Sequence, residues 1–98
     1  MDPREAYLEK LEAGLNQGAA EIEKIRAEAE NSEPQQRSFL YEFIEKLRAK
    51  HDELRSKTEK VKGAGTEQWE EHKDDVEQAH DELERAIDDA RSRLHAPD

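Results

Sequence analysis

Apolar residues recur at alternating steps of three and four along three separate stretches of this chain, and this spacing constrains the fold more than any other feature. The first stretch keeps the spacing at Leu8, Leu11, Leu15, Gly18, Ile22, Ile25 and Ala29. Residues spaced in this way line one face of a helix, and that face must be buried against another helix. The first stretch therefore predicts a long helix of the coiled-coil type.

The second and third stretches repeat the pattern with a few polar residues at apolar positions. The second comprises Leu40, Phe43/Ile44, Leu47, His51, Leu54, Thr58 and Val61, and the third comprises Trp69, His72, Val76, Ala79/His80, Leu83, Ala86/Ile87, Ala90 and Leu94. Composition alone suggests disorder, because only 16 of the 98 residues are Leu, Ile, Val or Phe and the net charge is −10. The spacing favours helices instead, since a disordered chain would scatter its apolar residues around each helix.

Capping residues and a proline mark where the helices begin and end. Asp2 suits the N-cap of the first helix and Pro3 its first position. Pro34 disfavours helical backbone at Glu33 and so separates the first helix from the second. We expect an all-α fold with helices at about 3–31, 35–62 and 66–95. Equal lengths and short connections predict an antiparallel three-helix bundle, with residues 1–98 as a single domain.

The segment with Gly63 and Gly65 has two interpretations. In the first, Gly63 ends the second helix as its C-terminal glycine and Thr66 caps the third, so the chain reverses. In the second, helices two and three are continuous, and two chains exchange their third helices in a domain-swapped dimer. Two interior glycines would cost a continuous helix about 2 kcal/mol, which favours the turn.

The sign of the charge alternates from stretch to stretch. Residues 1–33 carry 4 basic and 9 acidic side chains, residues 34–65 carry 8 and 5, and residues 66–98 carry 4 and 12. An antiparallel bundle would place the basic middle helix beside both acidic helices. The pairs expected within helices at i,i+4 spacing are Glu42–Lys46, Glu53–Lys57, Asp81–Arg85 and Asp89–Arg93. With a net charge of −10 the chain is not expected to bind nucleic acid.

Histidines and carboxylates supply the candidate metal ligands. Glu77 and His80 have the Glu-x-x-His spacing of carboxylate-bridged di-iron bundles, but the chain lacks the second copy that such a centre requires. A single site would use His51, His80 and a carboxylate such as Glu77. The other interpretation is that the histidines are partly buried polar residues that fix the register of the helices. We expect no cofactor.

Aromatic residues gather near the two ends of the predicted bundle. Tyr7 and Trp69 lie near one end, and Phe39, Tyr41 and Phe43 near the other. We expect them to close the ends of the core, with Tyr41 the one that protrudes into solvent.

Motifs of catalysis and of targeting are absent from the sequence. The chain has no cysteine, no serine in a nucleophile elbow and no phosphate-binding loop. The start lacks the features of a signal peptide, and no apolar run approaches the roughly 20 residues that span a bilayer. We therefore expect a non-enzymatic, soluble and cytoplasmic protein.

The third stretch, from Trp69-Glu70-Glu71-His72 through Leu94, resembles the C-terminal part of a family of small bacterial coiled-coil proteins of unknown function. Members of that family often begin with a Tyr-x-x-Lys-Leu-like stretch, to which Tyr7-Leu8-Glu9-Lys10-Leu11 is similar. The resemblance covers most of the chain. It implies a helical protein and supplies no activity or site residue.

The sequence thus favours a structural or protein-interaction bundle with an acidic surface, which binds a protein partner or a second copy through its helical faces. One alternative is a bundle that binds zinc or another divalent cation through histidines and carboxylates. A further alternative is amphipathic helices that open on a lipid surface. The negative charge opposes this on anionic membranes.

Overall fold

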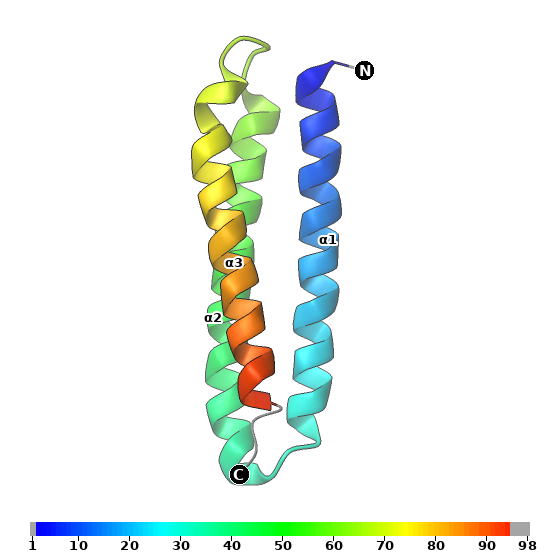
Figure 1. Cartoon of the computed structure of the whole chain (residues 1–98), viewed down its shortest axis with the longest axis vertical. Helices are drawn as coiled ribbons and strands as arrows, with labels where there is room; N and C mark the ends of the chain where they lie inside the picture. The colour runs from blue at the N-terminus through cyan, green and yellow to red at the C-terminus, as the bar shows by residue number, and fades with distance from the viewer. Residues whose placement is uncertain (1, 95–98) are drawn as a thin grey trace.

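The computed structural model describes residues 2–94, and these form the predicted antiparallel bundle of three long helices (Figure 1). Helix α1 spans Pro3–Glu30, α2 spans Pro34–Gly63 and α3 spans Lys73–Leu94, and a short 3₁₀ helix, η1, spans Trp69–His72. The molecule measures 51 × 20 × 18 Å. At a rise of 1.5 Å per residue, α1 and α2 are each about 42–45 Å long, so both run most of its length. The predicted end of the third helix at residue 95 lies outside the described residues.

The core consists of residues that stand at the predicted apolar positions. Its buried members are Leu11, Ile22, Ile25, Ala29, Leu40, Ile44, Leu47, Leu54, Val61, Trp69, Val76, Ala79, Leu83, Ile87 and Ala90. The largest fully buried side chains all belong to α2 or α3, namely Leu47, Leu54, Val61 and Val76. Leu8 and Leu15 of α1, in contrast, are only half-buried. The apolar face of α1 is therefore not completely covered by the other two helices.

The predicted starts of α1 and α2 are confirmed. The Asp2 carboxylate accepts a hydrogen bond from the backbone N–H of Glu5 at 2.8 Å, and Pro3 is the first residue of α1. Glu33 has extended backbone (φ −63°, ψ 148°) immediately before Pro34. The steric effect of a proline on the preceding residue therefore separates α1 from α2.

The turn between α2 and α3 differs from the prediction in its details. Gly63 is the last residue of α2 and has no positive φ, and the helix ends at Ala64, whose backbone is extended (φ −81°, ψ 153°). Thr66 caps no helix, because residues 66–68 form a turn in which the Gly65 carbonyl accepts N–H bonds from Gln68 and Trp69, both at 3.1 Å. The predicted reversal of the chain is confirmed, but Gly63 lies within the last turn of α2 and the third helix begins later than the predicted residue 66.

Tertiary packing of Trp69 explains this late start of α3. Its indole is only 6% exposed, and its ring centroid lies 5.4 Å from that of Tyr7 in α1. The tighter 3₁₀ turn of η1 brings the indole to the end of the core. The turn is also tied to α1, because Arg4 Nη1 donates a hydrogen bond to the Ala64 carbonyl at 2.6 Å. This bond provides a partner for a carbonyl at the end of a helix.

The basic middle helix pairs with both acidic neighbours, as the charge pattern predicts. Arg48 of α2 lies 3.5 Å from Glu23 of α1, and Lys50 of α2 lies 4.0 Å from Glu82 of α3. These side chains are largely exposed, so each pair contributes less than about 1 kcal/mol to stability.

Two of the four pairs expected within helices form. Glu53–Lys57 has a separation of 3.5 Å and Asp89–Arg93 one of 3.3 Å. Among residues 2–94, Glu42–Lys46 and Asp81–Arg85 do not form ion pairs. Lys46 instead places its ammonium 5.6 Å from the centre of the Phe43 ring.

The aromatic residues close one end of the bundle as expected and partly protrude at the other. Tyr41 is 39% exposed, as predicted, but Phe39 is also 45% exposed. Phe39 and Phe43 contact each other with centroids 5.4 Å apart, and the Arg93 guanidinium lies 4.7 Å from the centre of the Phe43 ring. The expectation that Phe39 closes the core is therefore wrong.

Candidate functional site: the groove between α1 and α3

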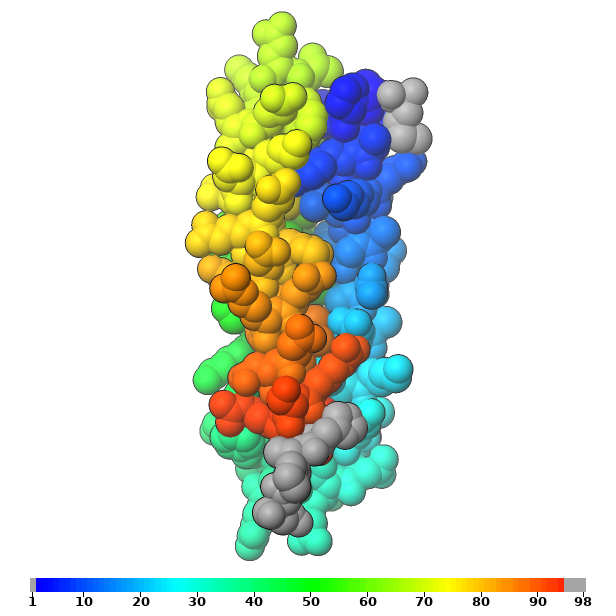
Figure 2. All heavy atoms as spheres, viewed as in Figure 1, coloured from blue at the N-terminus to red at the C-terminus, as the bar shows by residue number. Residues whose placement is uncertain are grey.

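The described surface is hollowed where α1 and α3 lie side by side, on the face that Figure 2 shows. One cavity of about 230 Å³ is lined by Gly14, Gln17, Gly18, Glu21, His80, Leu83, Glu84, Ile87, Asp88 and Arg91. A second cavity, of about 240 Å³, is lined by Tyr7, Lys10, Leu11, Glu77, His80 and Asp81. His80 lines both, so the two cavities are neighbouring parts of one feature, which we call the α1–α3 groove.

Two glycines of α1 account for the shape of the groove. A Cβ added to Gly14 would lie 3.6 Å from His80 Nε2, in ordinary van der Waals contact. A Cβ added to Gly18 would lie 3.4 Å from both His51 Cδ2 and Leu83 Cδ2, a tighter fit. Gly18 thus permits close approach of the helices, whereas Gly14 leaves space in front of His80.

His51 lies apart from the groove, in the interface of α2 with α1. Its side chain is buried, with 6% exposed, and its Nε2–H donates a hydrogen bond to the Leu15 carbonyl at 2.8 Å. It lines a different cavity from His80. This environment matches the interpretation of His51 as a buried polar residue that fixes the contact between two helices.

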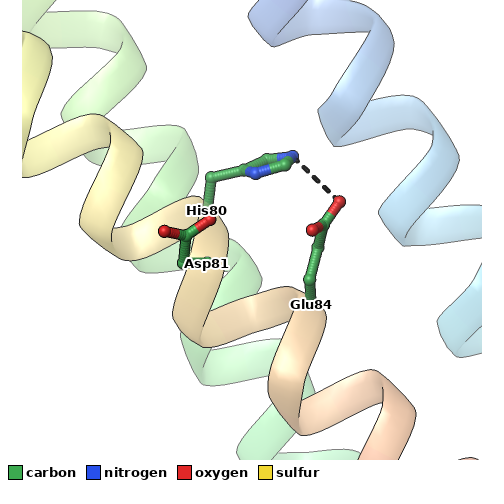
Figure 3. Close-up of side chains that lie close together, drawn as sticks. All are labelled: His80, Asp81 and Glu84. Carbon is green, nitrogen blue, oxygen red and sulfur yellow. Dashed lines mark ion pairs between the residues drawn. The ribbon is translucent and has the colours of Figure 1, made fainter.

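The side chains that could hold a metal ion are His80, Asp81 and Glu84, whose ligand atoms all lie within 4.8 Å of one another. His80 Nε2 is 3.5 Å from Glu84 Oε1, and these two side chains point toward each other in Figure 3. Tetrahedral zinc with bonds near 2.0–2.1 Å needs ligand atoms about 3.4 Å apart. The His80–Glu84 pair meets that requirement, and Asp81 would have to move closer.

The sequence prediction and this group share only His80. Glu77 lines the second cavity with His80 but is not in the group, and neither is His51. Asp81 and Glu84 were missed. The i,i+4 spacing of His80 and Glu84 is the signal that could have identified Glu84, because such residues lie one above the other on a helix.

Tyr7 forms part of the wall of the groove and has an unusual hydroxyl environment. The hydroxyl is buried beside the Glu77 carboxylate. Burial raises the pKa of Tyr7 above its ordinary value of 10.0, and the carboxylates of Glu77 and Asp74 raise it further. Tyr7 therefore remains neutral at physiological pH.

The rim of the groove on α3 is a row of carboxylates. Glu77, Asp81, Glu84 and Asp88 follow one another at steps of four, three and four residues and all line the groove. The rim on α1 has the same spacing and comprises Lys10, Gly14, Gln17 and Glu21. Within residues 2–94, no cation of α1 forms an ion pair with the carboxylate row.

An ion pair joins the two rims at the end of the groove that lies away from Tyr7. There Arg91 of α3 lies 3.1 Å from Glu21 of α1. Within the carboxylate row, Glu84 pairs with His80 on its own helix. Asp81 and Asp88 form no ion pair with any described residue. Chemically, this arrangement is suited to hold a cation or a row of positively charged side chains.

Neither a family model nor a curated protein nor a solved structure matches this chain. None of the helices within residues 2–94 combines the length and the apolar character that a bilayer-spanning segment needs.

Proposed function

We propose that this protein is a non-enzymatic helical module that binds another protein through its acidic outer surface. The observation that carries the proposal is how the bundle uses its charges. Arg48 and Lys50 of the basic helix α2 pair with Glu23 of α1 and Glu82 of α3. An excess of acidic residues remains on the other two helices, since α1 carries 4 basic and 7 acidic side chains (−3) and α3 carries 4 and 8 (−4).

Such a surface has a direct physical consequence for association. Exposed charges of one sign attract partners of the opposite sign and accelerate their encounter, and they contribute little to the stability of the fold. The groove formed by the two cavities, of about 230 and 240 Å³, is elongated along the helices. Its shape suits a segment of polypeptide that lies lengthwise.

Zero-length crosslinking tests the proposal. A carbodiimide joins a carboxylate to a lysine that touches it, so crosslinks formed in an extract of cells that express the protein record which carboxylates meet a partner. We expect adducts through carboxylates of α1 and α3, and fewer of them at about 0.5 M salt, where charges are screened within a few ångströms. Adducts that form only through α2, or none at all, would contradict the proposal.

We also propose that the closed bundle exchanges with a domain-swapped dimer in the cytoplasm. No residue of the turn has a left-handed backbone, so a change at Ala64 from extended to helical would straighten it. The variant Gly63→Ala, Gly65→Ala favours helical backbone and should raise the dimer fraction. Light scattering distinguishes a mass of 11.4 kDa from twice that value, and an unchanged monomer would count against the exchange.

A second candidate function is the binding of a divalent cation by His80, Asp81 and Glu84, which their proximity favours. Calorimetric titration with Zn²⁺ should give a dissociation constant below about 100 μM, or about −5.5 kcal/mol. The variant His80→Gln should lose this binding, and His72→Gln, which changes a histidine outside the group, should keep it. Equal binding by both variants would remove this candidate.

A further inference from the structure

We propose that the α1–α3 groove receives a basic helix of the partner protein, with lysine or arginine at steps of three and four residues and small residues beside them. This inference rests on the proposed function and names the chemistry of the partner. It follows from the length of the groove, from the charges on its two rims and from the space in front of His80.

The groove has the length of a short helix. On α1 it extends from Tyr7 to Glu21, and on α3 from Glu77 to Arg91. At 1.5 Å per residue each side is about 21 Å long, or about four helical turns. An elongated groove of this kind suits a helix that lies lengthwise, which is a common mode of peptide recognition.

The charges on the α3 rim require a partner that α1 does not supply. In bundles, residues that flank the apolar stripe at this spacing pair with opposite charges on the next helix and determine which helix binds. The carboxylate row faces a rim whose central positions are Gly14 and Gln17, both uncharged. A partner helix with cations at the matching spacing would complete the row.

The space at Gly14 determines which side chains the partner can present. Nothing of α1 projects from this position, and the floor of the groove includes the apolar side chains of Leu11, Leu83 and Ile87. A helix that enters must come close to the α1 backbone, so small residues such as alanine fit beside its lysines. A second copy of the chain is a poorer occupant, because its own basic helix α2 is committed to the core of its bundle.

The first experiment uses two designed peptides as probes. One is a helical peptide of about 18 residues, or five turns, made of alanine with lysine at steps of three and four. The other carries glutamate in place of each lysine. We expect the alanine–lysine peptide to bind and to shift the backbone amide resonances of α1 and α3 along the groove. The glutamate peptide should bind at least tenfold more weakly.

Charge variants of equal net charge then test the carboxylate row. The variant Asp81→Lys, Asp88→Lys reverses two members of the row, neither of which forms an ion pair in the bundle. The control Glu45→Lys, Glu59→Lys reverses two exposed carboxylates of α2. Both variants have a net charge of about −6, so any difference reflects location and not total charge. We expect the first to weaken peptide binding at least tenfold more than the second.

A steric pair tests the groove itself. Gly14→Trp fills the space in front of His80 and should weaken binding at least tenfold. Ala13→Trp places the same side chain on the exposed neighbouring position of α1 and should leave binding unchanged. Circular dichroism of each variant confirms that the bundle is still folded, and a variant that unfolds is replaced by Gly14→Leu.

The outcomes separate this inference from the proposed function. If the peptide binds elsewhere on α1 or α3 and both pairs of variants behave alike, the groove assignment is overturned and the proposed function stands. If the peptide does not bind at about 1 mM, a free energy weaker than about −4 kcal/mol, both are overturned. If the protein alone is a dimer that Gly14→Trp dissociates, a second copy occupies the groove and the inference is overturned.

Discussion

Replacement of Gly14 and of Gly18 by alanine should affect stability differently, although both glycines lie inside α1. In a helix interior, alanine is more favourable than glycine by about 1 kcal/mol. At Gly14 the added methyl carbon would lie 3.6 Å from its nearest neighbour, His80 Nε2, so the full gain is expected. For a domain of this size, about 1 kcal/mol corresponds to a rise in melting temperature of about 4–8 °C.

At Gly18 the same gain is opposed by crowding. The methyl carbon would lie 3.4 Å from both His51 and Leu83. His51 is held by its hydrogen bond to the Leu15 carbonyl, and Leu83 is only 2% exposed, so neither side chain moves freely. The contact at 3.4 Å is at the short end of the ordinary van der Waals range, so part of the gain is lost to the closer fit. We therefore expect Gly18→Ala to stabilise the bundle less than Gly14→Ala.

Urea unfolding followed by circular dichroism measures both variants against the wild type. An unchanged dependence on urea would show that the unfolded states are comparable. Equal stabilisation by Gly18→Ala and Gly14→Ala would refute this reasoning, because it would show that His51 and Leu83 move aside with no loss of stability. It is refuted equally if Gly14→Ala brings no gain.

Three further changes test other contacts of the bundle. Asp2→Ala removes the side-chain cap of α1 at the Glu5 N–H and should lower the free energy of unfolding by about 1 kcal/mol in the same assay, whereas Asp2→Asn should retain most of it. His51→Ala removes a buried ring and its 2.8 Å hydrogen bond and should cost about 2 kcal/mol or more, and an effect no larger than that of His72→Ala would count against its role. Burial, and after it the Glu77 carboxylate, raises the pKa of Tyr7 in the folded protein above the ordinary value of 10.0. The folded state is therefore stabilised by the neutral hydroxyl below pH 10, and this stabilisation is lost as the pH rises through the pKa of Tyr7 in the folded protein. Between about pH 9 and 11 the wild type should therefore lose more stability than Tyr7→Phe, and parallel curves would disprove the link.

The bundle could be predicted from the sequence because the spacing of apolar residues along each helix determines which face of that helix is buried. Two polar residues at apolar positions, His51 and Thr58, are buried as the spacing requires, whereas His72 and His80 are only partly buried. Thr58 is 2% exposed, and its hydroxyl donates a hydrogen bond to the Leu54 carbonyl at 2.8 Å. The spacing decides which face is buried, and the backbone of the same helix satisfies the hydroxyl.

The α2–α3 turn was predicted less well because distant contacts shape it. Local capping rules identify Thr66 as an N-cap, but they contain no information on Tyr7, against which Trp69 packs. The Arg4–Ala64 hydrogen bond likewise joins residues sixty positions apart. Local propensity is a weak guide where such tertiary contacts decide the backbone.

The groove could be predicted only in part for a related reason. The sequence indicated that Glu77 and His80 have the spacing of ligands on one helix face and that Gly18 lies on the apolar face of the first helix. It did not indicate which side of α1 faces α3, and so it did not place Gly14 opposite His80. The α1–α3 groove arises from the way in which α1 packs against α3. The spacing of residues within one helix does not specify this packing.

The charge pattern affects the interface in which the α1–α3 groove lies. In a three-helix bundle every helix touches both others, so the two acidic helices α1 and α3 must meet. Their repulsion is reduced where the α1 rim carries Gly14 and Gln17 in place of carboxylates, and at the end where Arg91 pairs with Glu21. The α1–α3 interface, where two acidic helices meet, thus contains the two cavities of the groove, and cavities of about 210 and 280 Å³ also lie between α1 and α2 and between α2 and α3. A cationic helix bound there would relieve the repulsion as well as fill the groove, so its binding should raise the free energy of unfolding of the whole bundle.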